Sequence, residues 1–145
     1  MMLRPVLLSI AVAMSTAAVP RPSGAVEPRN LPLQPLAADD RQAAGVGGTG
    51  CSWRSQVGAG ERFAMSDRIA IARIGRRRIV FGPHRAARDL FPFTFDRWRA
   101  AGTTVRVMAG AGKRIGTETM DMPARLMVTI RGRSSVLDGT MVCGS

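Results

Sequence analysis

The side chains that could carry nucleophilic or acid–base chemistry are few in this chain of 145 residues. Its single histidine, His84, would have to act as the base in any nucleophile–base pair. His84 follows Gly82 and Pro83 in a predicted loop beside Arg85, and the chain contains no G-x-S-x-G motif to present a serine nucleophile. We therefore interpret His84 as a surface residue and expect no triad-type active site.

Paired carboxylates are a second possible source of chemistry, because two of them can hydrolyse a glycosidic bond. Glu118 and Asp121 are close in sequence but would lie on opposite faces of a regular strand. Turn and surface positions, with arginines nearby as ion-pair partners, account for all of the acidic residues in the part expected to fold. The sequence therefore predicts a protein that is not an enzyme and uses no cofactor, with a small hydrolase as a distant alternative. The acidic residues in question are Glu61, Asp67, Asp89, Asp96, Glu118, Asp121 and Asp138.

The two cysteines, Cys51 and Cys143, predict a structural disulfide. A redox pair usually shows C-x-x-C, which is absent, and a zinc site needs about four ligands where the chain offers two cysteines and one histidine. Two cysteines in an exported chain most often pair. Their bond would close a loop of 93 residues, counted from 51 to 143, and would stabilise the fold by about 4–5 kcal/mol in the chain-entropy model.

Basic side chains are the remaining candidates for a binding site, since the formal net charge is +11. They concentrate at Arg76, Arg77 and Arg78, on a predicted hairpin turn after Gly75. Such a turn would attract an anionic lipid, a glycan or an envelope protein at low salt. Sequence-specific nucleic-acid binding is disfavoured, because only Trp98 lies among basic residues where a base could stack. The bias toward Ala, Gly and Arg also fits a GC-rich coding sequence, in which case the charge needs no ligand.

The N-terminus has the layout of a secretory signal peptide over residues 1–25. Arg4 precedes an uncharged apolar run over residues 6–19, and Ser23, Gly24 and Ala25 fit a small-residue cleavage site. The run is shorter than the ~20 residues that span a bilayer, and no second run long enough follows. We therefore expect a periplasmic or secreted protein, with no transmembrane segment in its mature chain.

Residues 26–49 have the composition of a disordered linker. Prolines dominate its first part and glycines its last part, and no apolar periodicity is visible. Residues 45–50 match G-x-G-x-x-G, but a dinucleotide site needs a strand before this motif and a helix after it. Here a polar linker precedes and a predicted strand follows, so the motif predicts no nucleotide site.

Residues 50–145 are predicted to form one β-domain. Alternation of apolar and polar residues over 124–131 and 136–143 predicts a terminal hairpin with a turn at Gly132 and Arg133. The same alternation over 51–57 predicts the first strand. Glycine turns at near-regular spacing indicate an all-β fold, a small antiparallel sandwich or barrel of about 7–9 short strands. A weaker strand is expected over 115–120, and residues 84–101 fit either helix or strand.

A small exported β-domain closed by one disulfide is similar in architecture to the periplasmic lysozyme inhibitors of the membrane-bound and periplasmic type. The resemblance implies an inhibitor of an envelope-degrading enzyme, with a loop such as residues 110–114 as the contact. The inhibitory-loop motif of that family has no counterpart in this chain, so none of its functional residues is carried over. Our first hypothesis is a non-enzymatic exported β-domain that binds an anionic envelope component or an envelope protein, with the inhibitor as the alternative.

Overall fold

The structure is a computed structural model that describes residues 31–91 and 94–144. The predicted signal peptide and residues 26–30 of the predicted linker lie outside this part. Strands dominate the described residues, whose one α-helix is the short α1 (Asp40–Ala43). No helix among them has the length and apolar character needed to cross a membrane.

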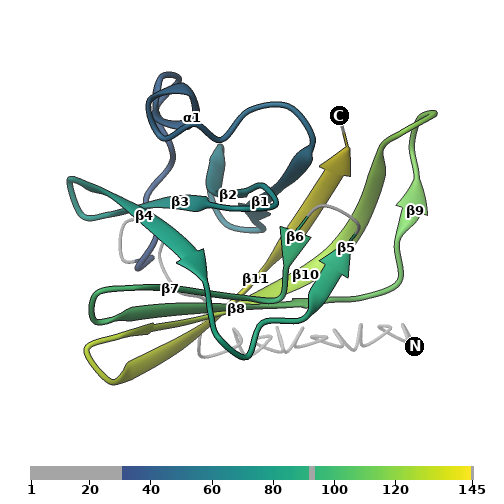
Figure 1. Cartoon of the computed structure of the whole chain (residues 1–145). Coiled ribbons are helices and arrows are strands. Elements are labelled where there is room, and N and C mark those ends of the chain that lie inside the picture. The colour runs from purple at the N-terminus through teal and green to yellow at the C-terminus, as the bar shows by residue number, and fades with distance from the viewer. Residues whose placement is uncertain (1–30, 92–93, 145) are drawn as a thin grey trace, which may run out of the picture.

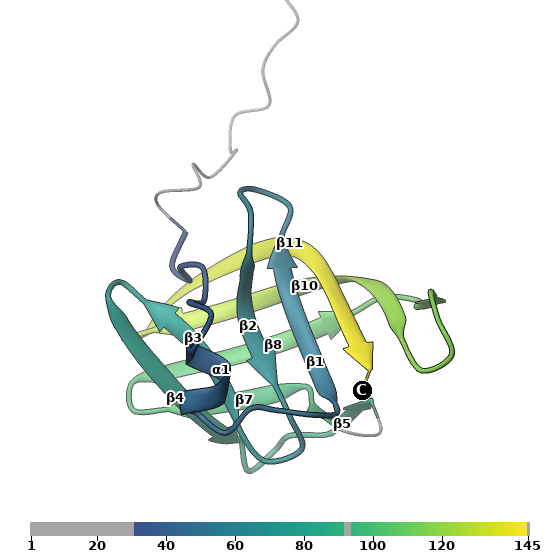
Figure 2. The same ribbon diagram turned by 90° about the horizontal axis from the view of Figure 1, so that it is seen from above.

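Eight antiparallel strands of the described chain close into a barrel (Figures 1 and 2). Each strand pairs with the next one along the chain, and β11 pairs with both β10 and β1. The predicted antiparallel all-β fold is confirmed, and of the two architectures left open the chain adopts the barrel. Its strands are β1 (Gly50–Ser55), β2 (Glu61–Met65), β3 (Ala70–Ile74), β4 (Arg77–Pro83), β7 (Arg97–Ala100), β8 (Thr103–Ala109), β10 (Met120–Ile130) and β11 (Arg133–Gly144).

Two smaller elements extend the barrel. A short hairpin of β5 (Asp89–Phe91) and β6 (Thr94–Phe95) lies between β4 and β7, so the described part of 84–101 contains strands rather than a helix. The two-residue strand β9 (Lys113–Arg114) pairs with the start of β10. The strand predicted over 115–120 is wrong: residues 116–118 form bends, and Ile115 donates its N–H to the Thr119 carbonyl oxygen at 3.0 Å across them.

Inward-facing side chains fill the barrel. Phe63 and Phe81 meet edge to face with ring centroids 5.7 Å apart, and Trp53 donates its indole N–H to the Ala124 carbonyl oxygen at 2.8 Å. The alternation predicted for the terminal hairpin is confirmed, although its turn is Arg131 and Gly132 rather than one residue later. Its buried side chains include Leu126, Val128, Leu137, Met141 and Cys143.

Residues 31–49, which we call the strap, correct the prediction of a disordered linker up to residue 49. Leu31 and Leu33, on either side of Pro32, are both buried in the barrel core. Farther along, Val46 packs against Ala64 and Ile71 in a second apolar cluster. Prolines of this kind predict solvated backbone, so composition alone does not indicate that the two leucines belong to the core.

Polar contacts fix the strap to the barrel, among them backbone hydrogen bonds from the N–H groups of Gln34 and Leu36 to the carbonyl oxygens of Arg73 and Glu61. Arg62 of β2 is buried beneath it and donates from Nη1 to the Leu33 carbonyl oxygen at 2.8 Å. Asp40 of α1 is also fully buried and forms ion pairs with Arg73 of β3 and Arg78 of β4. The strap is therefore held both through its backbone and through the Asp40 carboxylate.

Candidate functional site

The predicted disulfide between Cys51 and Cys143 is present and buried. The two residues are direct partners in the register of β1 and β11. The bond therefore joins the first barrel strand to the last, as the alternation at both ends of the domain predicts. A disulfide of this kind indicates a non-reducing compartment.

The predicted arginine cluster is divided by the fold. Arg76 lies in the turn after Gly75, Arg77 and Arg78 begin β4, and all three are exposed. Arg78, however, places Nη1 3.7 Å from Oδ1 of Asp40, so its charge is partly compensated. The sequence could not show this pairing because Asp40 belongs to the strap, which was expected to be disordered.

The Asp40 carboxylate is the centre of a small charge network. Its Oδ2 accepts hydrogen bonds from the Ala37 N–H at 2.6 Å and from Arg73 Nε, and its Oδ1 accepts from Arg73 Nη2 at 2.9 Å. The hydrogen bonds from Arg73 hold the pKa of Asp40 below its ordinary value even though burial acts in the opposite direction. The network clamps α1 to β3 and β4, and we assign it a structural role.

The strand order brings other arginines to the end of the barrel that carries Arg76. In a barrel whose sequential strands are antiparallel neighbours, alternate connections lie at the same end. The turns between β3 and β4, β7 and β8, and β10 and β11 accordingly lie together at the left in Figure 1. We call this the hairpin end, and its connections are residues 56–60, 75–76, 101–102 and 131–132.

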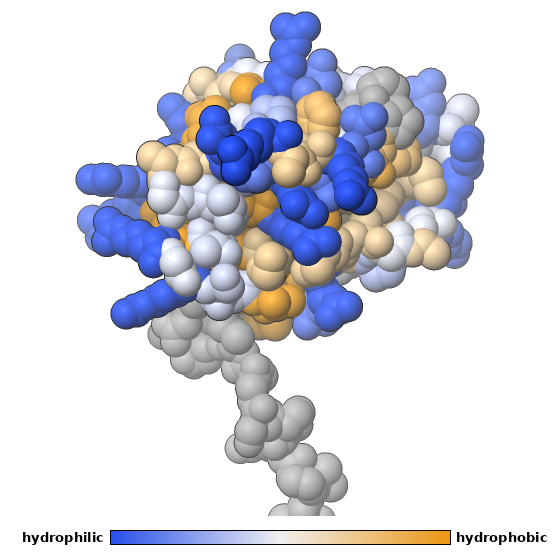
Figure 3. Space-filling view, turned by 60° about the horizontal axis from the view of Figure 1, so that its bottom comes forward, coloured by the Kyte–Doolittle hydropathy of each residue, from blue (hydrophilic) through white to orange (hydrophobic). Residues whose placement is uncertain are grey.

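Charge at the hairpin end is mostly positive. Its connections contain no carboxylate, and Glu61, which directly follows residues 56–60, is paired with Arg41. Four arginines lie in or directly beside these connections, and we call them the four turn arginines: Arg76, Arg77, Arg131 and Arg133. None of the four forms an ion pair with a described residue. Strongly hydrophilic side chains project from this end at the left of Figure 3. The opposite end mixes both signs: its connections contain Asp67, Asp96 and Glu118 as well as basic residues.

A pocket of about 480 Å³ lies at the hairpin end. Pro32, Val128 and Ile130 give it apolar walls, and Arg131 and Arg133 supply its cationic groups. Ser135 completes the lining with a hydroxyl group. The pocket thus combines apolar surface with two positive charges that no described carboxylate neutralises.

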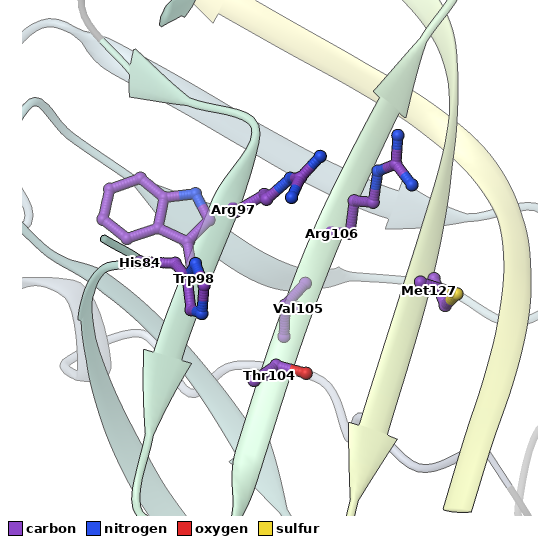
Figure 4. A pocket seen from close by; sticks show the side chains of 7 residues that line it. All are labelled: His84, Arg97, Trp98, Thr104, Val105, Arg106 and Met127. Carbon is purple, nitrogen blue, oxygen red and sulfur yellow. The ribbon is translucent and has the colours of Figure 1, made fainter. Parts of the chain in front are cut away.

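His84, predicted to be a surface residue, is half-buried beside a second pocket of about 210 Å³ (Figure 4). Its backbone N–H donates to the Arg97 carbonyl oxygen at 3.0 Å, which fixes the loop against β7. No carboxylate lines this pocket, whereas two cationic residues, Arg97 and Arg106, do. We call it the His84 groove. Sequence reasoning missed Arg106 because its position opposite Arg97 follows only from the register of β7 and β8.

Residues 110–114, the predicted inhibitor loop, project from the barrel with β9 (Figures 1 and 2). Residues 110–118 are all exposed, and Ile115 leaves 55% of its surface in solvent. Arg114 Nη1 donates to the Thr117 carbonyl oxygen at 2.9 Å, which helps to fix the tip. The projection is therefore a hydrogen-bonded hairpin with an apolar side chain near its end.

Several of the candidate carboxylates are engaged in ion pairs, as expected for surface positions. Glu61 pairs with Arg41 at 3.4 Å, and burial raises the pKa of its carboxyl above the ordinary value. Asp67, Asp96 and Asp138 also lie within 4.0 Å of an arginine. Among the described residues, no three histidine, cysteine or acidic side chains come together in a way that could hold a metal ion.

Comparisons with protein-family models, with curated proteins and with solved structures found no match to this chain. The resemblance to lysozyme inhibitors gains no support from them.

Proposed function

We propose that this protein is a non-enzymatic, exported β-barrel that binds anionic lipid surfaces of the cell envelope through its hairpin end. The observation that carries the proposal is the gathering of the four turn arginines, Arg76, Arg77, Arg131 and Arg133, at a barrel end whose connections hold no carboxylate. Each basic residue near an anionic membrane contributes about 1 kcal/mol. Four of them would give weak, reversible binding that salt suppresses.

The pocket at the hairpin end favours a lipid over a glycan or an acidic protein. Val128, Ile130 and Pro32 offer apolar surface directly beside Arg131 and Arg133. A glycan has no apolar chain to place against these walls. A phospholipid has both an anionic head group for the arginines and an acyl chain for the apolar surface. Hydrophobic contact adds to the electrostatic attraction in peripheral membrane binding.

The backbone at Arg131 is a further argument. Arg131 has φ 49° and Gly132 has φ 80°, the pattern of a type I′ turn. Asparagine or glycine suits the first of these positions, and a left-handed conformation costs other residues roughly 1 kcal/mol. The chain keeps a cation where the turn disfavours it, which is consistent with a role for that charge outside folding.

An export route to the envelope agrees with two independent features. The N-terminal pattern over residues 1–25 is that of a signal peptide, and the Cys51–Cys143 disulfide requires a non-reducing compartment. Both support an exported protein, and an exported protein would meet anionic lipid at the envelope.

Co-sedimentation with vesicles tests the proposal. Binding to vesicles that contain phosphatidylglycerol should exceed binding to pure phosphatidylcholine vesicles and should fall as salt rises above about 0.1 M. The double variants Arg76→Gln/Arg77→Gln and Arg131→Gln/Arg133→Gln should each lose at least half of the bound fraction. Lys113→Gln/Arg114→Gln, which removes the same charge at the β9 hairpin, is the control and should bind like the parent. Equal losses of vesicle binding in all three variants would show that net charge alone, and not the hairpin end, causes the binding.

A second candidate function is inhibition of an envelope-degrading enzyme. The projecting, hydrogen-bonded hairpin with exposed Ile115 is the observation that favours it. The protein would then slow the lysis of cell walls by lysozyme in a dose-dependent way, and Ile115→Asp would abolish the effect while Arg131→Gln/Arg133→Gln would not. Unchanged lysis at a large excess of protein would eliminate this candidate.

A further inference from the structure

The outer face of the barrel carries an ordered row of four side chains at the His84 groove. Arg97 of β7 is the register partner of Arg106 of β8, Arg106 is the partner of Met127 of β10, and Met127 is the partner of Val136 of β11. Two cations are thus followed, strand by strand, by two apolar residues. The guanidinium groups of Arg97 and Arg106 extend to the same side of their strands in Figure 4.

The two arginines face each other without full compensation. Like charges at directly opposite positions of an antiparallel pair destabilise a sheet. Asp96 places Oδ2 3.5 Å from Arg97 Nε, but no described carboxylate pairs with Arg106. The Arg97 Nε atom is buried and has no hydrogen-bond partner. An anion placed between the two guanidinium groups would remove the repulsion and could accept hydrogen bonds from both.

Two further donors border the same space. His84 accepts the Ala86 N–H on Nδ1 at 3.1 Å, which leaves Nε2 as the ring nitrogen that can donate. The Thr104 hydroxyl also lines the groove. An oxyanion with three terminal oxygens has acceptors for more than one of these groups, which β7, β8 and the His84 loop bring to the lining of one pocket.

The apolar half of the row indicates what the anion is attached to. Met127 lines the groove, and Val136 beyond it leaves 53% of its surface in solvent. An exposed valine next to a half-buried methionine offers a contact for a ring or short chain that continues from the anionic group.

We propose that the His84 groove is a second binding site, selective for a phosphate monoester with an apolar substituent. Its phosphate lies between Arg97 and Arg106, and its substituent lies over Met127 toward Val136. The site is on the side wall of the barrel and shares no residue with the pocket at the hairpin end. The test of this site is therefore independent of the test of lipid binding.

Titrations followed by amide ¹H–¹⁵N spectra test this site with three probes: phenyl phosphate, inorganic phosphate and phenol. Phenyl phosphate should shift the amides of His84, Arg97, Arg106 and Met127 and should bind about tenfold more tightly than inorganic phosphate, a difference of about 1.4 kcal/mol. Phenol should not bind measurably. Binding of inorganic phosphate as tight as that of phenyl phosphate would contradict the apolar half of the proposal.

Variants separate the site from general charge. Arg106→Gln should weaken phenyl phosphate at least tenfold, and Met127→Ser should remove the preference for phenyl phosphate over inorganic phosphate. Arg125→Gln, an exposed position on the same outer face that does not line the groove, is the control and should bind like the parent. The Arg131→Gln/Arg133→Gln variant should also bind phenyl phosphate normally. Unchanged affinity in Arg106→Gln, with a well-dispersed spectrum that shows the fold intact, would overturn the proposal.

Discussion

Cys51 lies directly opposite Cys143, with their Cα atoms 4.0 Å apart, at the seam where the last barrel strand meets the first. The same seam is paired along β1 and β11 from Gly50 to Ser55. The disulfide therefore adds a covalent bond to a strand pairing that closes the barrel. It joins chain positions 92 apart and restricts the unfolded chain over nearly the whole domain.

Removal of the disulfide should leave the fold recognisable but much less stable. The variant Cys51→Ser/Cys143→Ser should lose about 4 kcal/mol of unfolding free energy, which corresponds to roughly 20 °C in melting temperature. Thermal unfolding by circular dichroism measures the loss, and reduction of the parent protein should reproduce it. Retention of the parental melting temperature in the double variant would show that strand pairing alone holds the seam.

Loss of the Asp40 carboxylate should release the strap. Asp40→Asn leaves Arg73 and Arg78 without their shared partner and should cost about 3 kcal/mol at neutral pH. Because the pKa of Asp40 is lowered on folding, its stabilising effect is present above the unfolded value of about 3.9 and disappears as the pH falls through the lower folded value. Urea unfolding of variant and parent should therefore converge in strong acid. Asp39→Asn, one residue earlier and exposed, acts on Arg73 only through its charge and should lose much less stability than Asp40→Asn; an equal loss there would contradict the clamp.

Gly139 should not tolerate even one methyl group. A Cβ atom at this position would lie 2.1 Å from the Arg54 carbonyl oxygen and 2.5 Å from the Trp53 ring. Gly139→Ala should therefore displace the indole and cost about 3 kcal/mol or more, measured by chemical unfolding. Gly82→Ala is the matched control, because a Cβ atom there meets nothing within 4 Å, and its stability should change little. Similar stability of the two variants would show that the Trp53 packing described above is incorrect.

Substitution of Arg131 should increase the stability of the protein and decrease its binding to lipid. Arg131→Asn relieves the left-handed arginine and should raise the unfolding free energy by about 0.5–1 kcal/mol, while the bound fraction on phosphatidylglycerol vesicles falls. Arg133→Asn, which removes the same charge outside the left-handed position, should reduce binding without the gain in stability. A stabilised Arg131→Asn variant that binds like the parent would mean that the arginine serves no lipid contact.

The sequence predicted features that depend on local alternation. Leu126, Val128, Leu137 and Met141 follow a period of two that any half-buried strand imposes, and the inward phase of Cys143 follows from the same pattern. The choice of a barrel over a sandwich depends on the pairing of β11 with β1, which no local pattern specifies.

The candidate sites depended on contacts between distant segments. Asp40 partly compensates the charge of Arg78 from the strap, a proline-containing segment whose composition does not indicate that Leu31 and Leu33 are buried. The strand order brings Arg131 to the same end as Arg76 although 55 positions separate them in the sequence. Strand register and barrel closure, rather than composition, determine which arginines lie together. Of the four turn arginines, the sequence alone therefore indicated only Arg76 and Arg77.

Mapping of the lipid contact is the most direct test of the central claim. Amide ¹H–¹⁵N spectra of the protein, titrated with bicelles that contain phosphatidylglycerol, report which residues meet the lipid surface. The account predicts shifts and broadening concentrated in residues 75–77 and 131–133 and near Ile130, all reversed by added salt. Perturbations confined to the projecting residues 110–118, or spread evenly over the exposed arginines, would contradict lipid binding by the hairpin end.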